Sequence, residues 1–262
     1  MFQNLDAYKL KWIAIIGMVL SHAVYAWQEI LPLWLMIPMM ATGGLTYPIM
    51  GYFVVEGYKH TSNIKRYLLR LFTFGLIASL FYPLVFGMFQ LNIMFSIMLS
   101  LVMFMLYDKI KTRAVFWLIA FPLILVLSLV FDWWVFGIIM MIMYYTIRNE
   151  NTRRIAPAIV GGVLWSLFIV FGIVGLSALE AAPGMEAQVE AFHNTWGNMD
   201  FMISSTGMIL GCISAAILLK NYNGERGKRA KWLFYIAYPL HLAVLGGVAL
   251  ILGLVDLSVF GL

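Results

Sequence analysis

Residues 155–179 read IAPAIVGGVLWSLFIVFGIVGLSAL and contain no charged side chain. A helix needs about 20 mostly apolar residues to cross the hydrocarbon core of a bilayer, so this run is long enough to cross a membrane. The whole chain of 262 residues has the same character, because 63% of its residues are hydrophobic and only 11% are charged. Soluble domains carry about 25% charged residues. The composition therefore excludes an ordinary soluble enzyme, a disordered chain and a coiled coil.

Nine apolar runs, each bounded by polar or charged residues, predict an all-α fold: a polytopic helical membrane bundle with about nine transmembrane helices. The fifth and sixth runs are separated only by Asp132 and its neighbouring tryptophans. As one helix they would be about 50 Å long, which exceeds a hydrocarbon core of about 30 Å, so two spans joined by a tight turn are expected. We expect residues 1–262 to form a single integral membrane domain. The expected spans are 10–28, 31–55, 65–86, 91–107, 114–131, 133–147, 155–179, 201–220 and 231–254.

Charge is distributed unevenly over the segments outside these spans. All 17 lysines and arginines fall in the N-terminal segment, in alternate connections, or in the ends of the spans that border them. The remaining connections and the C-terminal segment carry only acids, namely Glu29, Asp132, Glu180, Glu186, Glu190, Asp200 and Asp256. Lys and Arg concentrate on the cytoplasmic side of membrane proteins. We therefore predict a cytoplasmic N-terminus, an extracytoplasmic C-terminus, a place in the lipid bilayer of the bacterial cytoplasmic (inner) membrane, and no nucleic-acid partner.

The first apolar run has a second interpretation. Its basic start and a small-residue site near residues 21–23 are also features of a cleaved signal peptide. The apolar residues continue past that site to Trp27, which favours a retained span.

Two histidines lie near mid-membrane in this arrangement, His22 in the first span and His241 in the last. Ionisable groups inside spans are costly and are therefore candidates for function. His22 follows Lys11 by about three helical turns, so both lie on one helix face, with His22 about 16 Å deeper. His241 shares a face with Tyr238 and follows Pro239, which removes a helical hydrogen-bond donor. An imidazole suits a general base or an acyl acceptor, and simple packing is the alternative for each.

The second basic connection supplies candidate phosphate-binding residues. Arg66 and Arg70 are four positions apart on one helix face, and arginine forks suit phosphate oxygens. The alternative is that they anchor the chain at lipid headgroups. Other ionisable groups nearby are Glu56, Lys59, His60 and Lys65, and a further basic cluster occupies residues 226–231. The sequence has no nucleotide-binding motif and no metal-spaced cluster of His, Cys or acids, so no metal is expected.

Taken together, these segments resemble the TraX family of membrane proteins. The resemblance covers nearly the whole chain, in the family's order. One departure is Ser21, because the family often has an Asp before the first-span histidine. The stretches that carry the resemblance are KWIAIIGMVLSH (11–22), YPIMGYFVVEGYKH (47–60), YLLRL (67–71), NIMFS (92–96) and FYIAYPLHL (234–242).

The resemblance implies a transmembrane acetyltransferase, because TraX proteins include the enzyme that N-acetylates conjugative F-pilin. The chain is also similar in logic to the acyltransferase-3 family, in which a basic residue precedes a first-span histidine by eleven positions, as Lys11 precedes His22. On this interpretation acetyl-CoA is the cytoplasmic donor substrate. The acceptor would be an extracytoplasmic peptide, such as a pilin amino terminus, or an envelope glycan.

Roles for individual residues follow from this interpretation. We expect His22 to act as the base or the acetyl carrier, Tyr238 to stabilise the oxyanion, and His241 and Glu56 to orient. The acids on the outer side would attract a cationic acceptor. The residues expected to bind acetyl-CoA are Lys11, His60, Arg66, Arg70 and Lys231.

Two other classes of function are compatible with the sequence. A proton-coupled transporter or flippase of a small anionic or lipid substrate would use His22 and His241 as a proton relay. Its anionic substrate would contact Arg66 and Arg70. An odd number of spans excludes two equal inverted halves, which many transporters have. A non-catalytic membrane assembly or immunity protein would need none of these side chains. Product formation that depends on acetyl-CoA separates the enzyme from both.

Overall fold

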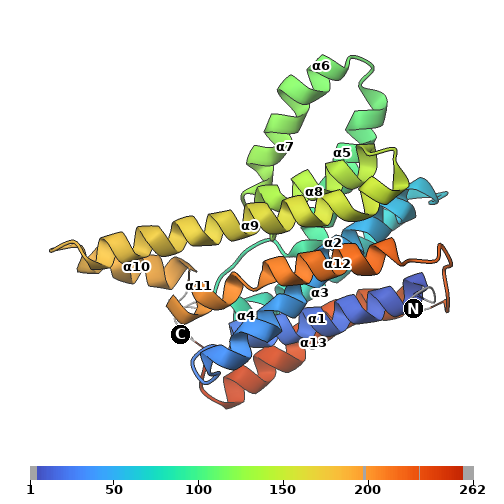
Figure 1. The fold of residues 1–262 in the computed structure, drawn as a ribbon. Coiled ribbons are helices and arrows are strands. Elements are labelled where there is room, and N and C mark those ends of the chain that lie inside the picture. Colours follow the sequence, from blue (N-terminus) through green and yellow to red (C-terminus); the bar gives the residue numbers. More distant parts are fainter. Residues whose placement is uncertain (1–4, 197–198, 230, 256–262) are drawn as a thin grey trace.

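The computed structural model describes residues 5–196, 199–229 and 231–255, and these residues form a bundle of long helices (Figure 1). The hairpin of α5 with α6 and α7 projects from the side of the bundle (Figure 1). The helices are α1 (Ala7–Trp27), α2 (Leu33–Lys59), α3 (Ile64–Ser79), α4 (Tyr82–Phe86), α5 (Ile93–Lys109), α6 (Arg113–Val115), the π-helix η1 (Phe116–Ala120), α7 (Phe121–Ser128), α8 (Trp134–Thr146), α9 (Glu150–Glu180), α10 (Glu186–Trp196), α11 (Met199–Ser205), α12 (Met208–Lys220) and α13 (Lys231–Ile251).

Each of the nine apolar runs is largely helical, so the expected all-α fold is confirmed over the described part of the chain. α3, α5 and α8 have 16, 17 and 13 residues, and at about 1.5 Å per residue each is shorter than a hydrocarbon core of about 30 Å. The nine-span count and the orientation therefore stay predictions. Five helical segments of the described residues are long and apolar enough to cross a membrane: Ala7–Trp27, Leu33–Lys59, Glu150–Glu180, Met199–Lys220 and Trp232–Ile251.

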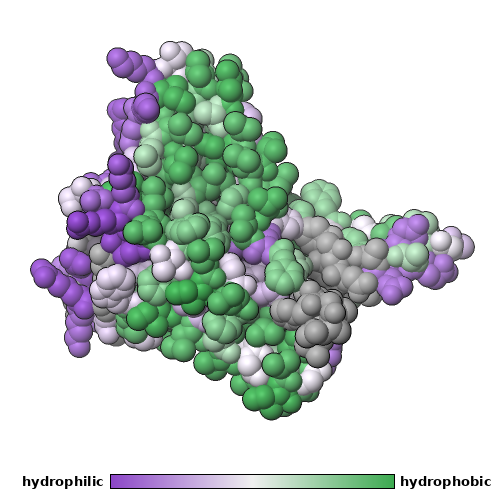
Figure 2. All heavy atoms as spheres, turned by 180° about the vertical axis from the view of Figure 1, so that it is seen from behind, coloured by the Kyte–Doolittle hydropathy of each residue, from purple (hydrophilic) through white to green (hydrophobic). Residues whose placement is uncertain are grey.

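The basic connections gather at one end of the bundle. The start of α1 and the α2–α3, α8–α9 and α12–α13 connections lie at the right of Figure 1, with the α5–α6 connection above them. Figure 2, seen from behind, shows hydrophilic side chains along the corresponding edge and hydrophobic ones across the middle. The acidic helix α10 lies at the opposite end. This separation agrees with the predicted distribution of charge, although Asp256 lies outside the described residues.

Small residues let the central helices approach closely. α2 packs against both α1 and α12. A Cβ placed on Gly211 of α12 would lie 1.9 Å from the carbonyl oxygen of Ala41 in α2. A Cβ on Gly17 of α1 would lie 2.3 Å from the carbonyl oxygen of Thr42. Close backbone approach through small residues is a main source of helix association in membranes, so these glycines hold α1, α2 and α12 together.

The third apolar run is divided into two helices, α3 and α4, and Pro83 stands at the start of the second. Pro83 lacks an N–H and stands in the first turn of α4, where this loss has no cost. The break beside it is fixed by Asn92, which caps α5. The Asn92 side-chain amide donates to the carbonyl oxygen of Gly75 (2.8 Å) and to Ser79 Oγ (3.0 Å). The bend brings Phe86 to the side of α1.

Gly211→Leu is expected to destabilise the protein, because the new side chain would meet the backbone of α2, which cannot yield as a flexible side chain does. Overpacking a well-packed core costs about 1–3 kcal/mol, and contact with backbone places this variant at or above the upper end. The measurement is the free energy of unfolding in a denaturing-detergent titration. Gly175→Leu is the control, since an added Cβ there meets nothing within 4 Å. Equal destabilisation by both substitutions would contradict the packing account.

Candidate active site

His22 of α1 and His241 of α13 are in direct contact, although 219 positions separate them. His22 Nδ1 lies 2.7 Å from His241 Nε2, and the ring centroids are 4.9 Å apart. His241 is almost fully buried, with 7% of its surface exposed. The structure therefore joins the two mid-span histidines of the sequence into one unit.

Hydrogen bonds around this pair define which ring nitrogen carries each proton. His241 Nδ1 lies 3.0 Å from the carbonyl oxygen of Ala237. Because a carbonyl only accepts, His241 Nδ1 must donate, and Nε2 of the neutral ring keeps its lone pair. His22 Nδ1 then donates to His241 Nε2, which leaves His22 Nε2 unprotonated. The hydrogen bond between the two rings thus uses His22 Nδ1 and leaves the lone pair of His22 Nε2 available to accept a proton.

His22 lines an internal cavity of about 100 Å³, which we name the central cavity. Its walls come from α1, α2, α4, α5, α9, α12, α13 and the turn before α8. Edge-on contacts with Phe86 (5.0 Å between centroids) and Tyr25 (6.3 Å) hold the imidazole of His22 from the side. The bend after α3 thus contributes directly to the position of the histidine.

The central cavity is also lined by polar groups that make no hydrogen bond in the described structure. The hydroxyls of Tyr47 and Tyr238 and the indole N–H of Trp165 are buried without a hydrogen-bond partner in the described structure. Ser100 lies near the Tyr47 hydroxyl and the Ile93 backbone near that of Tyr238, but neither pair has hydrogen-bond geometry. Leaving a buried donor unsatisfied costs about 1–3 kcal/mol, so these groups fit a polar ligand in the cavity.

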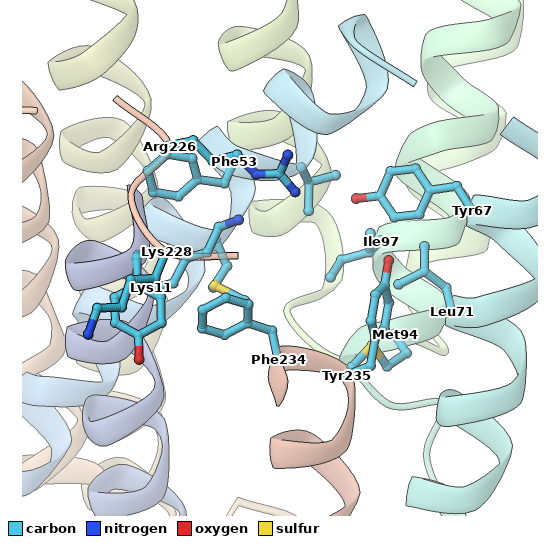
Figure 3. Close-up of a pocket in the computed structure, with 13 residues that line it drawn as sticks. Lys11, Phe53, Tyr67, Leu71, Met94, Ile97, Arg226, Lys228, Phe234 and Tyr235 are labelled. Atoms are coloured by element: carbon cyan, nitrogen blue, oxygen red, sulfur yellow. The ribbon is translucent and has the colours of Figure 1, made fainter. Parts of the chain in front are cut away.

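A second cavity, of about 180 Å³, lies toward the basic end of the bundle, and we name it the basic mouth (Figure 3). Lys11 of α1 and the loop residues Arg226 and Lys228 supply its positive charge. Figure 3 shows the Arg226 guanidinium and the hydroxyls of Tyr67 and Tyr235 turned toward one opening. The other lining residues are Tyr8, Met50, Phe53, Val54, Leu71, Met94, Ile97 and Phe234, and Lys11 Nζ lies 5.0 and 5.2 Å from the rings of Phe53 and Phe234.

The cavities adjoin one another through shared walls. The basic mouth and the central cavity are both lined by Met50, Met94, Ile97 and Phe234. Beyond the central cavity lies an aromatic-rich third cavity of about 390 Å³, the outer cavity, toward the end of the bundle opposite the basic mouth. The central and outer cavities share Tyr25, Phe86, Asp132, Trp133 and Trp165. The three cavities therefore follow one another along the bundle, with His22 in the middle one.

Glu56 lies apart from the histidine pair. Its Oε1 is 2.7 Å from Arg153 Nη1, and Arg153 Nη2 is 2.6 Å from Glu150 Oε2, so this network ties α2 to the start of α9. Arg153 is 6% exposed, and a buried arginine needs such partners. The structure thus gives Glu56 a place in a structural network, and it lines none of the three cavities.

Of the residues predicted to bind acetyl-CoA, some lie at the basic mouth and others lie away from it. Lys11 lines the basic mouth, whereas Arg70 contacts it through two lining residues. Its Nε donates a 3.5 Å hydrogen bond to the Tyr235 hydroxyl, and its guanidinium lies 5.7 Å from the Tyr67 ring centroid. His60 and Arg66 are exposed and line none of the three cavities. The side chain of Lys231 lies outside the described residues.

From the sequence, Asp132 was expected only in the tight turn between two spans. The structure confirms the turn and also places Asp132 between the central and outer cavities. A lone acid between two apolar runs, flanked by tryptophans, was the available signal. Arg226 and Lys228 were seen only as members of a basic cluster, and the fold brings them to Lys11.

The fold and its cavities define a helical membrane protein with a histidine pair at its centre. A sequence profile described as "TraX protein" matches residues 7–249, and the chain therefore belongs to the TraX family. The chain is also similar to a protein of Dichelobacter nodosus named "Probable fimbrial assembly protein FimC, serogroup H1". The two are 26% identical over 269 aligned positions, which cover 94% of this chain and 97% of that protein. No solved structure matches the chain.

The tautomers of the histidine pair are directly measurable. In protein labelled with ¹⁵N-histidine, both rings are expected to carry their proton on Nδ1, which is the less common neutral form. His241→Ala removes the acceptor of the His22 Nδ1 proton and should let His22 shift toward the Nε2-protonated form. Nitrogen chemical shifts in micelles report both states. An Nε2-protonated His22 in the unsubstituted protein would contradict the assignment.

Proposed function

We propose that the protein is a transmembrane acetyltransferase that moves an acetyl group from cytoplasmic acetyl-CoA to an extracytoplasmic peptide amine or envelope-glycan hydroxyl. The observation that carries this proposal is the His22–His241 pair in the middle of three adjoining cavities. The association of the TraX family with pilin acetylation and the fimbrial-assembly name of the D. nodosus relative support a pilus-related membrane protein. They favour a peptide of a surface filament as acceptor.

The basic mouth fits the donor. Acetyl-CoA has a phosphate-bearing nucleotide and a long, less polar pantetheine arm that ends in the thioester. A cavity of about 180 Å³ is smaller than the roughly 300–1,000 Å³ of ordinary ligand pockets, so it suits the arm and not the nucleotide. Lys11, Arg226 and Lys228 would attract the phosphates at the opening. The apolar residues shared with the central cavity would then conduct the thioester toward His22.

The free nitrogen of His22 fits the chemical step. As the acceptor nitrogen or oxygen attacks the thioester carbonyl, His22 Nε2 takes its proton. The new C–N or C–O bond forms, the C–S bond breaks, and the proton passes from His22 to the departing sulfur to give the CoA thiol. The unpaired Tyr238 hydroxyl is available to donate to the oxyanion. The same lone pair would also serve a two-step route through acetyl-His22.

His22→Ala is expected to lower the kcat for acceptor-dependent CoA release by at least about 100-fold, because general acid–base catalysis contributes about 10²–10⁴-fold. His241→Ala removes only the orienting partner, so its loss should be smaller. Purified protein in liposomes, with labelled acetyl-CoA, gives both the CoA release and any acetyl retained on the protein. Full turnover by folded His22→Ala protein would contradict the proposal.

Lys11→Ala and Arg226→Ala are each expected to raise the KM for acetyl-CoA by about tenfold or more, because hydrogen bonds to charged groups contribute about 1.5–3 kcal/mol. The kcat should change little, since neither side chain contacts the reacting atoms in this scheme. Lys111→Ala is the matched control, because Lys111 is exposed in the α5–α6 connection, away from the three cavities. An acetyl-CoA KM that is unchanged in both mouth variants would contradict the assignment of the basic mouth.

A further inference from the structure

Asp132 is held firmly in the wall between the central and outer cavities. Its backbone N–H donates to the carbonyl oxygen of Leu91 (2.8 Å), and its own carbonyl oxygen accepts from Ser96 Oγ (2.6 Å). Asp132 Oδ1 accepts from the backbone N–H of Trp133 (2.8 Å). Within the described structure, the carboxylate has no ion-pair partner and its Oδ2 accepts no hydrogen bond.

The surroundings of Asp132 are aromatic, and the described residues that line its two cavities include no lysine or arginine. The titratable groups that face it are tyrosines of α1, α2, α4 and α13, and His22 is the imidazole on the same central cavity. A buried carboxylate without a counter-charge is costly, and the faces of aromatic rings attract cations. Both features favour a cationic ligand. The tyrosines are Tyr25, Tyr47, Tyr82 and Tyr238.

An unusual turn presents this carboxylate. Trp133 and Trp134 have φ of 63° and 38°, and no other non-glycine residue of the described ranges has positive φ. L-residues with bulky side chains rarely adopt this left-handed region. The ring of Trp133 stacks on Tyr47 with centroids 4.5 Å apart and lies 5.6 Å from that of Trp165. These contacts hold the turn in a conformation that isolated tryptophans avoid.

We infer that Asp132 is the acceptor-side carboxylate: it binds the ammonium of an amine acceptor that enters through the outer cavity, and it takes the first of two protons that the nitrogen loses. This inference rests on the proposed acetyl transfer and adds a residue that acts on the acceptor.

The proton balance requires a second proton acceptor when the substrate is an ammonium ion. The overall reaction converts an alkylammonium and acetyl-CoA into an acetamide, the CoA thiol and one free proton. Asp132 takes the first proton, which frees the lone pair. The amine then attacks the thioester, the C–N bond forms, the C–S bond breaks, and the second proton passes through His22 Nε2 to the sulfur. Asp132 finally releases its proton through the outer cavity. A hydroxyl acceptor loses only one proton and does not need Asp132.

Burial supports this role of Asp132, because it raises the pKa of the carboxyl group to about 6. An α-amino group has a pKa of about 7.7–8.0, so transfer of its proton to Asp132 is uphill by about two pKa units. A solvent-exposed Asp, with a pKa of about 3.9, would face a gap of about four units. Above about pH 6 the carboxylate is ionised, and it is therefore ready to bind an ammonium ion at neutral pH.

The test compares Asp132→Asn with the unsubstituted protein on two probes: a short peptide amide with a free amino terminus, and its analogue in which a hydroxyl replaces the amine. Product formation from acetyl-CoA is followed across pH, and probe binding is measured by titration calorimetry. Asp132→Asn should lower kcat/KM for the amine at least tenfold at pH 7. The loss should shrink toward about pH 9, where the amine is deprotonated in solution. Turnover of the hydroxyl probe and the KM for acetyl-CoA should not change.

Asp200→Asn is the matched control, because Asp200 is an exposed acid on α11, which packs near the same end of the bundle. An unchanged amine KM and pH profile in Asp132→Asn protein would overturn the role of Asp132 while acetyl transfer stands. Equal losses on both probes would assign Asp132 a merely structural role and also overturn it. Amine binding that requires Asp132, in protein that releases no CoA with either probe, would instead overturn the proposed acetyl transfer and keep the amine site.

Discussion

The hydrogen bond between His22 Nδ1 and His241 Nε2 is the contact on which the account of this protein depends. It links the first and last helices of the bundle at a buried position, where His241 is 7% exposed, and buried polar groups are satisfied by partners within the protein. The carbonyl oxygen of Ala237 fixes the proton of His241, and His241 in turn fixes that of His22. The basic nitrogen of His22 is therefore oriented by the fold before any substrate binds.

The cavities on either side of this pair differ in chemistry. The basic mouth combines cations with aromatic and apolar walls. The outer cavity is largely aromatic, and among its described lining residues Asp132 supplies a carboxylate. A reaction that brings a phosphate-bearing donor from one end and an acceptor from the other would need this asymmetry. The TraX family, to which the chain belongs, is associated with pilin acetylation, which is the context of the proposed reaction.

Much of the fold was predictable because hydrophobic length is a local property of the sequence, and each of the nine apolar runs is largely helical. The number of crossings stays a prediction, since helices such as α8, with 13 residues, are shorter than a full span. His22 and His241 were candidates because ionisable groups at depth are costly. Lys11 was a candidate because it shares a helix face with His22. Their contacts, and the burial of Asp132, depend on how distant helices pack, and no local pattern contains that information. The orienting role expected for Glu56 stays a prediction, and the structure adds that its carboxylate pairs with Arg153.

The most direct test of transfer across the membrane is a sided assay in inverted bacterial membrane vesicles, whose cytoplasmic face is outermost. Labelled acetyl-CoA is added outside, and a peptide with a free amino terminus is trapped in the lumen. The account predicts labelled acetyl-peptide in the lumen, and none when right-side-out vesicles are loaded in the same way. Product that forms only when donor and acceptor are on the same side of the membrane would contradict it.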